Sequence, residues 1–171
     1  MLRLDLSKLA REGTVQLEER IPPDADLWKD LEFTFEGPVR VRLQGMYAGS
    51  GEVVVRGTVD ARIRQECRRC LEPVRTERSE EITAVFVGSS SDDPDVGDDD
   101  VRFFDAGAAE LDVGPAVREE IVLNIDRFVV CDPECKGLCP QCGIDLNEAE
   151  CDCTFDEPDP RWDALRALKN E

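Results

Sequence analysis

Residues 39–70 read VRVRLQGMYAGSGEVVVRGTVDARIRQECRRC, and apolar side chains occupy every second position over most of this stretch. The alternation begins at Val39, is interrupted by the glycine turn at 49–51, and resumes from Val53 to Ile63. A period of two residues is the pattern of strands that bury one face and expose the other. The stretch therefore predicts two antiparallel strands, with arginines on the solvent side.

A pair of cysteines follows the second of these strands. Two residues separate Cys67 from Cys70, and the segment from Val74 to Phe86 then resumes the alternation as a returning strand. The sequence thus places the cysteine pair at the tip of a long β-hairpin. Shorter alternating runs upstream predict further strands at residues 2–6, 13–21 and 31–35.

Beyond this β region the pattern changes twice. Residues 89–100 contain six aspartates and one apolar residue, a composition that predicts a solvated acidic linker. A helix is then predicted to open at 111–113, with Asp112 as N-cap and Pro115 in its first turn. Its apolar stripe is Val113, Val117 and Ile121.

Residues 123–130 are predicted to be extended. A last helix is predicted from Asp159–Pro160, with a docking stripe that consists of Trp162, Leu165 and Leu168.

The expected fold class is α+β. We predict a mostly antiparallel β-sheet or partial barrel with one covering helix, a C-terminal zinc-knuckle segment and a short C-terminal helix. The expected organisation is a β domain at 1–88, the linker at 89–100, a helix and extended segment packed on the sheet at 101–130, and a cysteine-rich segment with the last helix at 131–171.

Six of the eight cysteines lie in residues 131–153, CDPECKGLCPQCGIDLNEAECDC. Cysteines two residues apart, followed by the glycine at Gly143, form the knuckle that tetrahedral zinc requires. Histidine is absent from the chain, so a zinc site here would use thiolates alone. The candidate ligands, for up to two structural zinc ions, are Cys67, Cys70, Cys131, Cys135, Cys139, Cys142, Cys151 and Cys153.

Other uses of eight cysteines were weighed against zinc. Residues 1–13 contain no apolar signal core, which argues against export and four disulfides. A thioredoxin-like redox pair would need a βαβ context that the sequence lacks. An iron-sulfur cluster uses the same thiolates, and cysteine spacing does not separate it from zinc.

Four close pairs can form two four-thiolate sites in three ways. Cys139/Cys142 and Cys151/Cys153 are separated by an eight-residue loop and can close one site locally. That division leaves Cys67/Cys70 to join Cys131/Cys135 across residues 71–130. The alternative places Cys131, Cys135, Cys139 and Cys142 around one metal, and its two three-residue spacers must then turn tightly in succession.

The formal net charge is −18, which is unfavourable for general phosphate binding and favours a basic partner such as a ribosomal protein. Hydrolysis of RNA would need a base, a nucleophile or a pair of metals held by carboxylates. Histidine is absent, and the densest carboxylates lie in the linker, so we do not expect an enzyme. Without a long apolar run or a signal core, the expected location is the cytoplasm.

One region departs from the acidic average. Residues 56–78 carry a local excess of positive charge, and four arginines are expected to cluster at the hairpin tip as candidate RNA contacts. These are Arg62, Arg64, Arg68 and Arg69. The competing interpretation is that they balance neighbouring acidic side chains across the strands.

The motifs together resemble the YceD family, also called DUF177. The resemblance spans nearly the whole chain. It includes CRRCLEP at 67–73, the acidic linker, VREEI at 117–121, CKGLCPQCGIDLN at 135–147, CDC at 151–153 and DPRW at 159–162. It implies a non-enzymatic ribosome-biogenesis factor for synthesis, processing or stability of large-subunit (23S) ribosomal RNA, in bacteria and plastids. A carrier or chaperone for a basic large-subunit ribosomal protein is the alternative.

Overall fold

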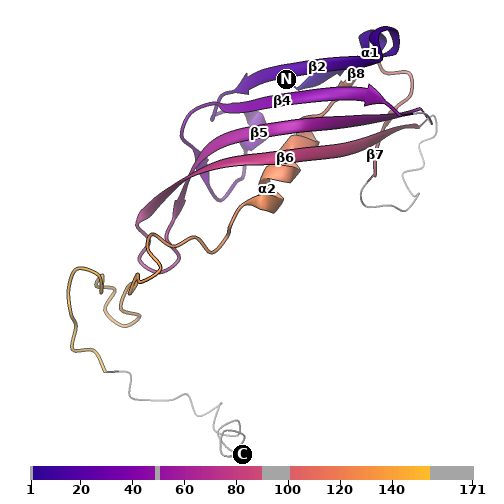
Figure 1. The fold of residues 1–171 in the computed structure, drawn as a ribbon. Helices are drawn as coiled ribbons and strands as arrows, with labels where there is room; N and C mark the ends of the chain where they lie inside the picture. Colours follow the sequence, from indigo (N-terminus) through magenta and orange to yellow (C-terminus); the bar gives the residue numbers. More distant parts are fainter. Residues whose placement is uncertain (1, 49–50, 90–100, 155–171) are drawn as a thin grey trace, which may run out of the picture.

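The computed structural model describes residues 2–48, 51–89 and 101–154 of the 171-residue chain. Its main element is a twisted, open sheet with strand order β2-β4-β5-β6-β7, and β3 pairs with β5 beside β4 (Figure 1). The strands are β2 (Thr14–Ile21), β3 (Thr34–Phe35), β4 (Val39–Tyr47), β5 (Glu52–Glu66), β6 (Pro73–Ser89) and β7 (Val101–Asp105).

The predicted hairpins are confirmed. Strands β4, β5 and β6 pair antiparallel, and the register places Arg40 opposite Asp60 and Arg64 opposite Arg75. Side chains on the inner face of these strands are buried, as the alternation predicts, including Val41, Val59 and Ile63. The Cys67–Cys70 pair lies in the loop between β5 and β6, at the tip of the longest hairpin.

The predicted covering helix is present as α2 (Gly114–Asn124), but the structure has a further helix that was not predicted. The structure contains α1 (Leu6–Glu12), which sequence analysis assigned partly to a strand. Only β1 (Arg3–Asp5) is extended there, because the Asp5 carboxylate accepts the N–H of Lys8 at 2.7 Å and starts a helix. Leu6 and Leu9 then pack into the core at helical spacing. A 3₁₀ turn, η1 (Asp26–Trp28), was also not predicted.

The region between the linker and the second helix was predicted incorrectly as well. Two strands were missed there: β7, which runs parallel to β6, and β8 (Glu110–Asp112), which pairs antiparallel with β1. Consequently α2 begins later than expected, at Gly114, and ends at Asn124. Asp112 belongs to β8 and is not the N-cap, although its carboxylate accepts the Gly114 N–H at 2.9 Å.

Helix α2 covers the inner face of the sheet through the predicted apolar stripe, which is buried (Figure 1). Arg118 secures this helix to the η1 region by donating to the carbonyl oxygens of Leu27 and Lys29, the latter at 2.7 Å. Residues 123–130 are not extended throughout, because Leu123 is still helical and residues 127–128 form a turn. The chain then reaches the hairpin tip.

Two predicted features lie outside the described residues: most of the acidic linker, and the helix expected from Asp159–Pro160. None of the helices in the described part of the chain combines the length and the apolar character that crossing a membrane requires.

Candidate metal centres

The first four-cysteine group joins the hairpin tip to the segment that follows α2. It consists of Cys67, Cys70, Cys131 and Cys135, whose sulfurs all lie within 4.8 Å of one another. The closest approaches are 3.5 Å between the sulfurs of Cys70 and Cys131 and 3.9 Å between those of Cys67 and Cys135. Cys131 is exposed and the other three are buried, so one corner of the group faces solvent.

Backbone hydrogen bonds hold these two segments together. The N–H of Arg68 donates to the Val129 carbonyl at 3.0 Å, and the N–H of Leu138 donates to the Arg69 carbonyl at 2.9 Å. The hairpin tip is thus fixed on both sides of Cys135 by main-chain contacts that a change of side chain would not remove.

The side chains of Arg68 and Arg69 add to this clamp. Arg68 Nε donates to the carbonyl of Arg127 at 2.6 Å. Arg69 Nη1 donates to the carbonyls of Pro133 and Cys135, at 3.0 and 2.8 Å. Two of the four arginines singled out as RNA contacts therefore bind backbone oxygens of the cysteine-rich segment, an internal role that sequence analysis did not foresee.

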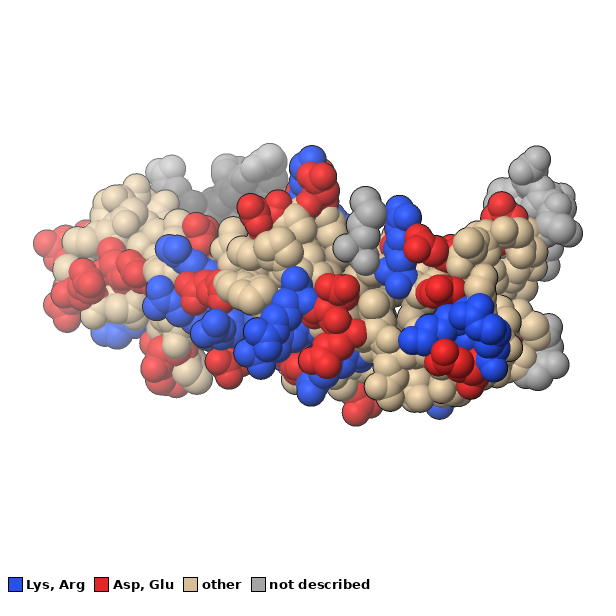
Figure 2. Space-filling view, turned by 90° about the horizontal axis from the view of Figure 1, so that it is seen from above, with Lys and Arg blue, Asp and Glu red and all other residues tan. Residues whose placement is uncertain are grey.

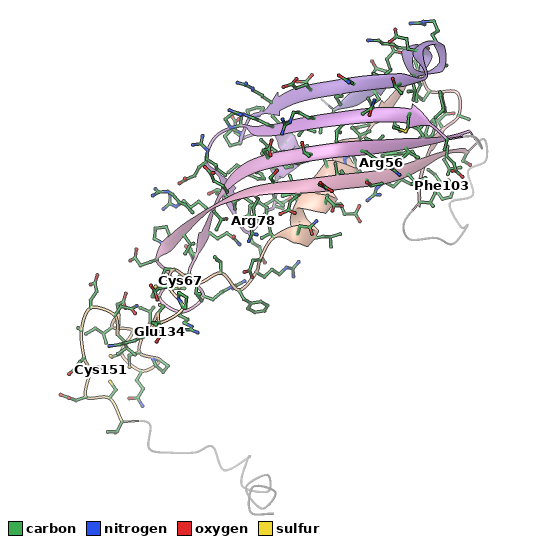
Figure 3. All side chains as sticks on the ribbon, in the orientation of Figure 1. Arg56, Cys67, Arg78, Phe103, Glu134 and Cys151 are labelled. Atoms are coloured by element: carbon green, nitrogen blue, oxygen red, sulfur yellow. The ribbon has the colours of Figure 1, made fainter. Side chains whose placement is uncertain are left out.

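The other two arginines have a different environment. Arg62 and Arg64 are exposed on the outer face of β5, and neither forms an ion pair within residues 2–48, 51–89 and 101–154. Figure 3 shows the hairpin tip at Cys67 beyond the main body of the sheet. The structure thus divides the predicted arginine cluster into two free and two engaged side chains.

Each group begins with the same kind of turn. In the hairpin tip, Leu71 N–H donates to the Cys67 carbonyl at 3.0 Å, and Leu71 has φ 63°. In the second group, Gly143 N–H donates to the Cys139 carbonyl at 2.8 Å, with φ 73°. The turn needs a left-handed residue after its second cysteine. Glycine supplies it in one turn and leucine, at a conformational cost, in the other.

The second four-cysteine group is local. It consists of Cys139, Cys142, Cys151 and Cys153, again with all sulfurs within 4.8 Å. Only Cys139 is buried, and its N–H donates to the Ile144 carbonyl at 2.8 Å. These are the two groups of four that the spacing predicts, and the alternative grouping of Cys131, Cys135, Cys139 and Cys142 is not formed.

Asn147 links the two groups and was missed by sequence analysis. Its side-chain N–H donates to the sulfur of Cys135 at 3.4 Å, and its carbonyl oxygen accepts the Lys136 N–H at 2.8 Å. A second contact is Leu146 N–H to the Gly137 carbonyl, at 2.9 Å. An asparagine in a polar loop gives no sequence signal for such a role, because the contact depends on how the loop folds back.

The thiols of each group differ in acidity. Burial opposes ionisation of Cys67, but the backbone N–H groups of Cys70, Cys131 and Arg69 together lower its pKa to about 6. Hydrogen bonds from the backbone of Cys142 and Gln141 lower the pKa of Cys139 to about 6 as well. Each group therefore holds a thiolate at neutral pH.

Other cysteines in the same two groups have a raised pKa. Side-chain hydrogen bonding with Cys70 and Cys135 raises the pKa of Cys131 to about 12. The sulfur of Cys142, and then burial, raise the pKa of Cys153 to about 12. Four thiolates in such proximity repel one another, so a cation is needed to ionise them all.

The donor sets fit a tetrahedral metal ion. Zinc bonded to four sulfurs at about 2.3 Å places those sulfurs roughly 4 Å apart, close to the 3.5 and 3.9 Å contacts of the first group. Both groups could therefore hold metal ions. With four thiolates bound, the metal has no open position for water or substrate.

The architecture defines a class of protein: an open, mostly antiparallel sheet whose longest hairpin carries cysteines that lie against those of a cysteine-rich segment. Comparison with protein families identifies the family to which this architecture belongs. Residues 55–169 match the family described as large ribosomal RNA subunit accumulation protein YceD. The chain belongs to the YceD family, as the resemblance predicted.

Relatives are found in bacteria and in plants. An uncharacterized protein of Mycobacterium tuberculosis is 29% identical over 96% of this chain and 79% of its own length. The uncharacterized protein YlbN of Bacillus subtilis is 29% identical over 92% of this chain and 86% of its own length. A chloroplastic large ribosomal RNA subunit accumulation protein, YCED homolog 1 of Arabidopsis thaliana, is 33% identical over 43% of this chain and 23% of its own length. No solved structure matches the chain.

Proposed function

We propose that the protein is a non-enzymatic ribosome-biogenesis factor that supports the synthesis, processing or stability of 23S ribosomal RNA in the cytoplasm. The observation that carries the proposal is membership of a family described by large ribosomal RNA subunit accumulation. Named plant relatives carry the same description. The geometry adds support, because a metal ion held by the four thiolates of either group would have no open position for catalysis.

The metal in this proposal is zinc, one ion in each four-cysteine group. Cys67, Cys70, Cys131 and Cys135 would hold one ion, and Cys139, Cys142, Cys151 and Cys153 the other. Both ions would be structural. The first would fix residues 131–154 to the hairpin tip, so that the β domain at 1–88, the segment 101–130 and the cysteine-rich segment 131–171 act as one unit, with 89–100 as a linker.

RNA contact in this proposal begins at the hairpin tip. Arg62 and Arg64 are exposed and free of ion pairs within the described residues, so their guanidinium groups can contact phosphates. Arg68 and Arg69 are exposed but already donate to backbone carbonyls. We expect them to contribute to RNA binding mainly by fixing the shape of the tip.

A second function is favoured by a separate observation. The cysteine-rich segment is strongly acidic, and most of the carboxylates in its described part are exposed, among them Asp132, Glu134, Glu148, Glu150 and Asp152. Figure 2 shows acidic side chains at the end of the molecule where this segment lies. Such a surface fits a basic large-subunit ribosomal protein, which this chain would carry or protect.

The two functions are separated by cross-linking in cells that express the tagged full-length chain. The proposal predicts cross-links to 23S ribosomal RNA or its precursor, and loss of mature 23S ribosomal RNA when the gene is removed. A covalent partner that is exclusively a ribosomal protein, with 23S ribosomal RNA at its normal level in the deletion strain, would instead establish the carrier function.

A further inference from the structure

The solvent-facing side of the sheet brings together arginines that are far apart in sequence. Arg20 of β2 lies directly opposite Arg40 of β4, and Arg40 lies opposite Asp60 of β5. Arg62 and Arg64 continue the same face of β5 toward the hairpin tip, because side chains two residues apart share a face. We call Arg20, Arg40, Arg62 and Arg64 the outer arginine face.

Two other arginines on this side are already paired. Arg42 binds Asp60 at 2.8 Å, and Arg75 binds Glu36 at 2.8 Å. Asp60 uses its second carboxylate oxygen to accept the hydroxyl of Ser79 at 2.7 Å. By contrast, the four members of the outer arginine face make no ion pair among the residues that the structure describes.

The arrangement costs stability. Like charges directly opposite each other on neighbouring strands are destabilising, and Arg20 opposite Arg40 is such a pair. Asp60 lies opposite Arg40 and Glu77 opposite Arg62, but neither carboxylate forms an ion pair with these arginines among the described residues. An anionic ligand bound across the strands would remove the repulsion.

The surface also has a shape that admits such a ligand. A hollow of about 470 Å³ lies between Arg40 and Arg62. Its other lining residues are Pro38, Asp60, Ala61, Glu77, Arg78 and Ser79. Figure 2 shows basic side chains over the middle of this view, interspersed with acidic ones, and one end that is mainly acidic. The outer arginine face thus groups arginines from three strands on a chain whose net charge is −18.

We propose that the outer arginine face binds the phosphate backbone of RNA, with one phosphate in the hollow between Arg40 and Arg62. This inference rests on the proposed function and adds Arg40 of β4 and Arg20 of β2, one and two strands away from β5, to the contact surface. The planar guanidinium group of arginine can donate two parallel hydrogen bonds to phosphate oxygens. Within the described strands the hollow is not lined by aromatic side chains. The protein would therefore contact the phosphate backbone of the RNA and would not stack on its bases.

Substitution of Glu77 provides a second test, in which RNA binding should become stronger. Glu77 lies directly across from Arg62 and lines the hollow, yet it forms no ion pair with it among the described residues. A carboxylate beside a phosphate site repels the ligand. Glu77→Gln removes that repulsion and should therefore strengthen RNA binding, whereas a substitution that merely damages the sheet would weaken it.

The test uses the full chain and a transcript of 23S ribosomal RNA in a mobility-shift titration over a salt series. One variant replaces Arg20, Arg40, Arg62 and Arg64 with glutamine. The control variant replaces Lys8, Arg11, Lys29 and Lys136 with glutamine, which removes the same charge from exposed positions elsewhere. Circular dichroism and metal content verify that both variants keep the fold.

The expected result is at least about tenfold weaker binding by the outer-face variant, and a log–log salt slope smaller by about 3, with little change in the control. Glu77→Gln should bind about twofold to threefold more tightly at low salt. Equal affinity of the outer-face and control variants, while the unchanged protein binds, overturns this inference and leaves the proposed function in place. If the unchanged protein does not shift the transcript at all, both are overturned.

Discussion

The two four-cysteine groups use the same ligands in different topologies. The first joins residues 67–70 to residues 131–135 across the whole of β6, β7, β8 and α2, and three of its cysteines are buried. The second is closed within residues 139–153, and one of its cysteines is buried. Closing a long loop restricts the unfolded chain more than closing a short one. The first group should therefore stabilise the whole fold, and the second only its own segment.

The largest difference is expected from matched ligand substitutions. Cys67→Ser should lower the free energy of unfolding of the sheet by about 3 kcal/mol or more, because it removes both a buried ligand and the long-range link. Cys151→Ser should change sheet stability by less than about 1 kcal/mol, since its partners are local. Each variant should lose one metal ion. Denaturant unfolding followed by circular dichroism, with metal analysis, measures both effects, and equal losses of stability would refute the comparison.

A smaller difference is expected between two glycines. A Cβ at Gly137 would lie 2.8 Å from the carbonyl oxygen of Arg69, and φ there is +76°. At Gly143 φ is +73°, but no atom lies within 4 Å of the added Cβ. Gly137→Ala should cost about 2–3 kcal/mol, from steric overlap and strain together, and Gly143→Ala about 1 kcal/mol from strain alone.

Thermal unfolding of the two alanine variants measures this difference. A Gly143→Ala protein as unstable as Gly137→Ala would show that the hairpin tip and the cysteine-rich segment are less closely packed than the contact between Gly137 and Arg69 indicates.

Asn147 tests the link between the groups. Asn147→Ala removes the hydrogen bonds to the Cys135 sulfur and to the Lys136 N–H, and should weaken zinc binding by the first group about tenfold. The control is Asn124→Ala, because the Asn124 side chain bonds to Glu120 alone among the residues that the structure describes. Competition with a chromophoric chelator gives the affinities. Identical release curves for the two variants would remove Asn147 from the metal centre.

The smallest effect concerns the residue that ends the first turn. Leu71 has φ 63° and is 57% exposed, so Leu71→Gly relieves strain and loses little packing. We expect a gain in stability of about 1 kcal/mol. Leu123→Gly, at a 70% exposed position inside α2, should instead cost about 1 kcal/mol because glycine disfavours the helix. A loss of stability in Leu71→Gly would mean that the exposed leucine makes a contact that matters.

The sequence predicted the sheet and the cysteine groups for a clear physical reason. The alternation of apolar and polar residues in β4 and β5 follows directly from the burial of one face of the sheet. The close spacing of the cysteine pairs follows directly from the arrangement of the two groups. The short helices and strands have no comparable sequence pattern. Leu2, Leu4 and Leu6 alternate like a strand, and only the Asp5 cap and the buried Leu9 turn the chain into α1.

The arginines show a further limit of sequence analysis. Arg68 and Arg69 resemble Arg62 and Arg64 in sequence, but they bind carbonyls of residues 127–135, about sixty positions away. Arg20 and Arg40 join the same face only through strand register. Which charges are free therefore depends on tertiary contacts that no local pattern encodes.

We propose that the protein holds two separate metal ions, each bound by four thiolates. X-ray absorption at the zinc edge, on protein purified without added metal and with its metal content measured, tests it most directly. We expect two zinc ions per chain and a coordination shell of four sulfurs at about 2.3 Å, with no nitrogen or oxygen ligand. A single metal ion per chain, iron in place of zinc, or cysteines joined in disulfides would contradict it.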